Sequence, residues 1–138
     1  MFVMIQRIQS LWLLLAAAIN PLMLLTPMPE RMAADPAIWI YWAPVSMLAL
    51  ASFALITAIL LFKKPGIQLQ VIRIGTLSLA GVLAFEVAIL FSLGGIGPYL
   101  WDEAIAPIIT GASLVLAYLG RRAVISDQQL LASVDRLR

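Results

Sequence analysis

The chain contains no cysteine and no histidine, and charged residues make up only 12% of its 138 positions. Without cysteine it can form no disulfide or thiol nucleophile, and without histidine as well the usual ligands of zinc and of most haem sites are missing. We therefore expect no metal and no cofactor. Soluble domains carry about a quarter charged residues, whereas here 63% of residues are hydrophobic and the mean hydropathy is +1.02. These proportions exclude a soluble globular protein and a disordered one, and they predict a protein that lies in lipid.

The few charges divide the chain into four long apolar stretches. They contain 22, 27, 28 and 17 residues and lie between Arg7 and Glu30, Asp35 and Lys63, Arg73 and Asp102, and Glu103 and Arg121. A hydrocarbon core about 30 Å thick needs roughly 20 residues of helix, and in lipid the helix satisfies its own backbone hydrogen bonds. We predict an all-α domain over residues 1–120, an up-down bundle whose transmembrane helices lie near 8–28, 38–62, 70–93 and 102–120. The first stretch resembles a signal peptide, but it stays apolar through Leu25, so we expect a retained helix.

The predicted connections are short and rich in residues that end helices. Residues 26–36 contain three prolines, Lys63-Lys-Pro-Gly66 is a polar turn, and Gly94-Gly-Ile-Gly-Pro98 is a second group of helix breakers. Short connections favour antiparallel neighbours, which is the basis of the up-down prediction.

Basic residues predict the orientation. If both termini are cytoplasmic, eight of the nine basic residues lie inside and only Arg31 lies outside. An outer aromatic belt agrees with this orientation: Trp39, Tyr41, Trp42, Tyr99 and Trp101. We expect a multi-pass protein of the bacterial inner membrane with cytoplasmic N- and C-termini. The pI of about 9.4 then reflects topology, and no nucleic acid partner is expected.

Glu86 is the one charged residue inside the third apolar stretch. It lies 13 residues after Arg73, which is about 20 Å along a helix and therefore within the hydrocarbon. A carboxylate there is costly, so we expect Glu86 to face a partner or a cavity, or to be protonated. Three residues are expected at a similar depth, one on each of the other helices: Asn20, Ser46 and Thr110.

Three interpretations of Glu86 remain open. It is a proton- or ion-handling carboxylate, a neutral acid that hydrogen-bonds neighbouring helices together, or a contact to another protein's helix. The four apolar stretches contain no second charged residue with which to build a relay, so we favour the second and third interpretations.

The last residues predict a short amphipathic helix on the cytoplasmic side, within a tail that spans 121–138. Ser126 and Gln129 fit a capping box, with Ser126 as N-cap. Apolar residues follow at helical spacing: Leu130, Leu131, Val134 and Leu137. This helix can lie along the inner membrane surface, fold back on the Lys63–Lys64 turn, or dock to a partner.

Both ends of the chain resemble an uncharacterised family of small bacterial four-helix membrane proteins. Met4-Ile-Gln-Arg-Ile-Gln-Ser10 resembles a family start of the form M-x-Q-R-I-Q-[ST], and Ser133-Val-Asp-Arg-Leu-Arg138 resembles a family end of the form S-x-D-R-L-R. The Phe62-Lys-Lys64 turn followed by Gln68 is similar to the family's middle loop. The resemblance implies the four-helix fold and Met4 as an alternative start to Met1, and it implies no activity.

The two family-like ends are predicted to meet on the cytoplasmic side. We expect Arg7 to pair with Asp127 or Asp135, and Gln6 or Gln9 to contact the polar face of the tail, which ends with Asp135 and Arg136. This contact serves either as a docking surface for a partner or as a clasp that closes the bundle.

No catalytic triad or metal site can be assembled without histidine and cysteine, so we expect no enzyme. Small size and patterned cytoplasmic ends favour an accessory or assembly subunit of a larger membrane complex. The expected partners are the lipid bilayer and another membrane protein or further copies of the chain. The alternative function is a small oligomeric transporter or proton- or ion-conducting protein that uses Glu86.

Overall fold

The computed structural model describes residues 2–92 and 101–137, and the side chains of 7–92 and 102–137. The described residues form helices and connections, with no strand among them. The elements are α1 Phe2–Ile19, the 3₁₀ helix η1 Asn20–Leu25, α2 Met28–Ala33, α3 Trp39–Leu60, α4 Pro65–Ser92 and α5 Trp101–Arg136. Four helical segments are long and apolar enough to cross a membrane. The prediction of an all-α protein is therefore confirmed.

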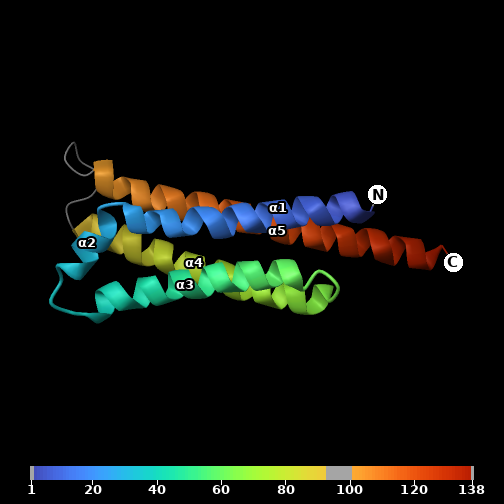
Figure 1. Ribbon diagram of the computed structural model, residues 1–138, viewed down its shortest axis with the longest axis horizontal. Helices are drawn as coiled ribbons and strands as arrows, with labels where there is room; N and C mark the ends of the chain where they lie inside the picture. Colours follow the sequence, from blue (N-terminus) through green and yellow to red (C-terminus); the bar gives the residue numbers. More distant parts are fainter. Residues whose placement is uncertain (1, 93–100, 138) are drawn as a thin grey trace.

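The long helices form an elongated bundle (Figure 1). α1 packs along α5, α3 packs along α4, and further contacts between α1 and α3 and between α4 and α5 join these two pairs into a ring. The chain ends lie toward one end of the bundle, which we call the tail end, while α2 lies at the opposite end, which we call the α2 end (Figure 1).

The first apolar segment changes helix type near its end. Pro21 has no backbone N–H and its ring clashes with the carbonyl four residues earlier, so the α-helix stops at Ile19 and a 3₁₀ helix follows. The chain then enters α2, which the sequence analysis placed in a loop. Met28 and Met32 of α2 are buried against Met23, so this short helix covers the α2 end of the interior.

Two helices begin earlier than predicted. α1 begins at Phe2 instead of near residue 8, and α4 begins at Pro65 instead of near residue 70. The predicted bounds followed the charges, which mark where hydrocarbon ends and not where a helix ends. Proline is well suited to the first position of α4 because its missing N–H has no partner there in any helix.

The predicted separate tail helix is wrong. Residues 121–136 continue α5, which runs without a break for 36 residues, and Ser126 is an interior residue instead of an N-cap. Arg121, Arg122 and the three residues after them contain no glycine or proline, so nothing interrupts the helical hydrogen bonds. The tail is therefore a rigid continuation of a membrane-spanning helix.

Small residues bring α1 and α5 together. Ala16, Ala17 and Ala117 are buried in one apolar cluster with Leu13. A Cβ built at Gly120 would lie 2.7 Å from Leu13 Cδ2, closer than real contacts allow. In lipid, such close backbone approach replaces the hydrophobic effect as the source of helix association.

Gly120→Ala is expected to destabilise the bundle relative to Gly111→Ala by about 1–3 kcal/mol, the usual cost of overpacking. Both substitutions bring the same gain in helix propensity within α5, but a Cβ at Gly111 meets nothing within 4 Å. Thermal unfolding of the purified variants in one detergent measures the difference. Equal melting temperatures would contradict the close α1–α5 approach.

Candidate functional site

The buried polar residues form hydrogen bonds between helices in the middle of the bundle. Glu86 of α4 is fully buried, and its Oε1 accepts a hydrogen bond of 2.9 Å from Thr110 Oγ1 of α5. One turn along α5, Ser113 Oγ donates to the Ala16 carbonyl of α1 at 2.8 Å. The structure thus brings Glu86 and Thr110 together, as their depths predicted.

Asn20 of η1 forms a further hydrogen bond between helical segments, to α3. Its Oδ1 accepts a hydrogen bond of 2.7 Å from Ser52 Oγ, and the Asn20 side chain is fully buried. Ser46, the residue predicted on this helix, is exposed, and its hydroxyl bonds to the Ala43 carbonyl of its own helix. The prediction of Ser46 is wrong because depth along a helix does not fix the face on which a residue lies.

The sequence did not predict Ser52, because it does not show which side of α3 faces the interior. Ser52 follows Leu48 by four residues, which places it on the same side of α3, and Leu48 is buried. Ser46 precedes Leu48 by two residues, about 200° around the helix. The apolar periodicity of α3 is weak because lipid-facing positions are as apolar as core positions.

Two buried atoms of this polar group have no hydrogen-bond partner among the described residues. They are Asn20 Nδ2, a donor, and Glu86 Oε2, an acceptor or, when protonated, a donor. The described residues contain no group of three or more acidic, histidine or cysteine side chains that could hold a metal ion. The polar group can therefore accommodate a proton or a further hydrogen bond.

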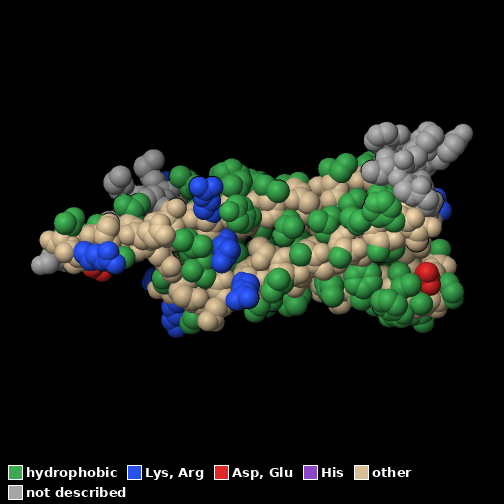
Figure 2. Space-filling model, turned by 180° about the vertical axis from the view of Figure 1, so that it is seen from behind, with side chains coloured by type: hydrophobic (Ala, Val, Ile, Leu, Met, Phe, Trp, Pro, Cys, Tyr) green, Lys and Arg blue, Asp and Glu red, His purple; other side chains and the backbone are tan. Residues whose placement is uncertain are grey.

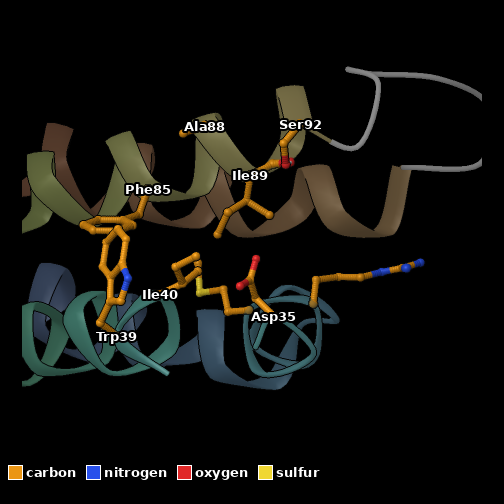
Figure 3. Close-up of a pocket in the computed structure, with 9 residues that line it drawn as sticks. Asp35, Trp39, Ile40, Phe85, Ala88, Ile89 and Ser92 are labelled. Atoms are coloured by element: carbon orange, nitrogen blue, oxygen red, sulfur yellow. The ribbon is translucent and has the colours of Figure 1, made fainter. Parts of the chain in front are cut away.

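A cavity of about 360 Å³ opens between α3 and α4 at the α2 end (Figure 3). Its wall is mainly apolar, and Trp39 meets Phe85 edge to face with ring centroids 6.0 Å apart. The Asp35 carboxylate points toward Ile89 in this view, and its Oδ1 accepts the Ala37 N–H at 2.9 Å. This carboxylate therefore fixes the chain where it enters α3.

An ion pair joins α2 to α5 at the same end. Arg31 donates to Glu103 Oε1 at 3.0 Å, and the Glu103 side chain is almost fully buried while that of Arg31 is half exposed. The sequence predicted only that Arg31 lies on the outer side and that Glu103 borders the fourth apolar stretch. It missed the pair because nothing in the sequence places α2 over the first turn of α5.

At the tail end, Gln9 is the predicted clasp residue that contacts α5. Gln9 is buried, and its Nε2 donates to the Ala123 carbonyl at 3.2 Å. Gln6 lies in α1, and its side chain is outside the described ones.

The predicted ion pairs of Arg7 are not formed. Arg7 is exposed and pairs with neither Asp127 nor Asp135, although the structure describes all three side chains. Because α5 continues straight, Asp135 lies 12 residues, about 18 Å, beyond the level of Ala123. Asp135 and Arg136 are exposed there, away from the rest of the bundle.

Asp127 faces a second cavity instead. This cavity of about 290 Å³ lies between α1, the α3–α4 turn and α5. Gln68 lines it from α4 and donates from Nε2 to the Ala58 carbonyl of α3 at 3.0 Å. Asp127 Oδ1 is buried without a partner among the described residues. The cavity is lined by Gln9, Phe62, Lys63, Pro65, Gln68, Val124, Asp127, Gln128 and Leu131.

Thr110→Val is expected to lower the free energy of unfolding by about 1 kcal/mol, because Glu86 then loses its hydrogen bond inside the bundle. Ser46→Ala removes an exposed hydroxyl from another long helix and should change it by less than about 0.5 kcal/mol. Unfolding in detergent, followed by circular dichroism, measures both variants. Equal effects would show that the Glu86–Thr110 bond does not stabilise the bundle.

Comparison with known families identifies most of the chain. Residues 30–137, which are 108 of the 138 residues, match the family described as "Domain of unknown function (DUF4293)". No curated protein and no solved structure matches the chain. The matched range begins after the family-like start at Met4, so that motif lies outside it. The chain therefore belongs to the DUF4293 family, an uncharacterised family as the resemblance indicated.

Proposed function

We propose that this protein is a non-enzymatic accessory or assembly subunit of a larger complex in the bacterial inner membrane. In this proposal the four long helices cross the bilayer up and down, with both termini cytoplasmic, and the end of α5 docks onto a partner subunit. The observation that carries the proposal is the continuous helical extension of α5 beyond the bundle.

The length of α5 exceeds what a bilayer requires. Its 36 residues span about 54 Å, whereas the hydrocarbon core is about 30 Å thick. Figure 1 shows the last part of α5 extending past the other helices at the tail end. A tail that served only to lie on the membrane would bend at the interface, but this one continues in line with the membrane-spanning helix.

The extension carries an apolar stripe that no other described element covers. Leu130, Val134 and Leu137 are 47%, 42% and 88% exposed. Their spacing of four and then three residues places them on one face of the helix. This is the pattern with which one helix packs against another in a groove or a coiled coil.

Basic residues support the proposed orientation. Most of the Lys and Arg side chains visible on the face in Figure 2 gather toward the tail end, and apolar side chains cover much of the rest. Bacterial membrane proteins keep such residues in cytoplasmic loops.

A proton- or ion-conducting role for Glu86 is the alternative. The unpartnered Glu86 Oε2 favours it. Against it, the buried polar side chains near Glu86 bond to one another between helices, and the two cavities described above lie toward the ends of the bundle.

The topology can be tested with single cysteines because the chain has none of its own. Ser133→Cys should react with a membrane-impermeant maleimide only after the cytoplasmic side is opened. Ala34→Cys should react in intact spheroplasts. Both positions are exposed, and the reverse labelling pattern would exclude the proposed orientation.

Leu130→Glu combined with Val134→Glu should release the partner, because charges replace the apolar stripe. Gln129→Glu combined with Ala132→Glu adds the same charge to the opposite face and should leave the complex intact. Native mass spectrometry after purification in mild detergent measures the complex. Recovery of only the 15 kDa chain, alone or as a homo-oligomer, would argue strongly against the subunit proposal.

Reconstituted vesicles test the alternative function directly. Under the subunit proposal, wild-type protein and Glu86→Gln should give the same proton flux as empty vesicles. A flux through wild-type protein that Glu86→Gln abolishes, with normal insertion and assembly, would support the conducting role and contradict the subunit proposal.

A further inference from the structure

The cavity at the tail end is formed by four elements of the chain. α1 contributes Gln9, the α3–α4 turn contributes Phe62 and Lys63, α4 contributes Gln68, and α5 contributes Asp127 and Leu131. Its volume of about 290 Å³ exceeds that of several water molecules, each of which occupies about 30 Å³ in the liquid. The cavity is therefore large enough for a small organic group.

The lining combines one acid, one base and several amides. Asp127 Oδ1 is buried and accepts no hydrogen bond from the described residues, so it is suited to a cationic donor. Lys63 is exposed at the rim and forms no ion pair with Asp127, although the structure describes both side chains. The separated charges favour a ligand that carries a positive group and a negative group.

The amide side chains are held in fixed positions. Gln9 and Gln68 are each 3% exposed, and each donates from Nε2 to a backbone carbonyl of a neighbouring helix. Because both side chains are already anchored, a ligand meets a preorganised wall and little side-chain entropy is lost on binding.

The position of the cavity along α5 corresponds to the lipid headgroup layer. Arg121 follows Asp102 by 19 residues, about 28 Å, which matches the thickness of the hydrocarbon core. Asp127 lies six residues further, about 9 Å, near the outer limit of the headgroup layer. The end of a lipid headgroup reaches this level.

We propose that this cavity binds a phosphoethanolamine group, the headgroup of a zwitterionic membrane lipid. The primary ammonium donates to the Asp127 carboxylate, and the Lys63 ammonium pairs with the phosphate. Phe62 and Leu131 supply apolar surface in the same cavity. The site requires only that the helices span a bilayer, so it goes beyond the proposed subunit role and does not depend on a docked partner.

The chemistry distinguishes this headgroup from the other common ones. A primary ammonium offers three N–H donors, whereas the trimethylammonium of phosphocholine offers none and cannot satisfy Asp127. Phosphoglycerol carries the same phosphate but ends in neutral hydroxyls, so it supplies no positive charge to the buried carboxylate. The predicted order of preference is therefore ethanolamine over choline and over glycerol.

The chain supplies matched controls for both contacts. Asp127→Asn removes the carboxylate that faces the cavity, and Asp135→Asn makes the same change at an exposed position on the same helix. Lys63→Gln removes the lining ammonium, and Lys64→Gln alters its exposed neighbour, which does not line the cavity. All four variants remove one formal charge, so general electrostatics cannot explain a difference within a pair.

The experiment reconstitutes each full-length variant in vesicles of equal parts phosphatidylethanolamine, phosphatidylcholine and phosphatidylglycerol and identifies retained lipid by native mass spectrometry. Wild-type protein should retain one phosphatidylethanolamine in preference to the other two. Retention should fall about tenfold in Asp127→Asn and Lys63→Gln, which corresponds to about 1.4 kcal/mol. It should be unchanged in both control variants, and circular dichroism should show equal helicity in all five proteins.

A second arm identifies the source of the headgroup. Soluble phosphoethanolamine is added to protein in detergent without lipid. If soluble phosphoethanolamine binds and Asp127→Asn abolishes that binding, the site also takes the free compound. If only phosphatidylethanolamine binds, the site is specific for the membrane lipid. Equal retention of phosphatidylcholine, preferential retention of phosphatidylglycerol, or equal losses in Asp127→Asn and Asp135→Asn would overturn the proposal.

Discussion

The bundle depends on hydrogen bonds between helices that lie in lipid. Lipid-facing and core-facing side chains are equally apolar there, so burial alone gives the helices little reason to associate. Side-chain hydrogen bonds join the neighbouring segments of the ring. They are Asn20–Ser52 between η1, which continues α1, and α3, Gln68–Ala58 between α4 and α3, Glu86–Thr110 between α4 and α5, and Gln9–Ala123 and Ser113–Ala16 between α1 and α5. Close packing at small residues such as Gly120 completes these contacts.

The interior of the bundle and its two ends differ in how their polar and apolar groups are covered. The interior polar groups bond to one another or to backbone carbonyls of neighbouring helices. The α2 end is covered by buried methionines and by the Arg31–Glu103 pair. At the tail end the helices have unequal lengths, and α5 continues alone past the others. That inequality leaves both an uncovered apolar stripe and a cavity beside the α3–α4 turn, and both proposals of function arise from it.

The sequence predicted much of the fold because the bilayer constrains the length of each apolar segment, which can be counted along the chain. A bilayer of fixed thickness requires apolar stretches of fixed length, and the sparse charges mark their ends. The number of long helices, their approximate positions and the Glu86–Thr110 level followed from this counting. The side of each helix that faces the interior did not follow from this counting. Ser46 and Ser52 differ by less than two turns in depth, and apolar periodicity hardly distinguishes core-facing from lipid-facing positions in such helices. The prediction of a separate tail helix was wrong for a related reason. A capping pattern at Ser126 has no effect where the preceding residues already form a helix.

The sequence by itself therefore determined the class of protein, the number of apolar helices, and the presence of an acid that must be neutralised or paired. Only the tertiary structure decided which polar groups meet, that α5 continues as one helix, and that Asp127 and Lys63 line one cavity. The physical reason is that length and hydropathy are properties of single segments. Hydrogen bonds and cavities depend on the rotation and offset of several helices, which packing alone fixes.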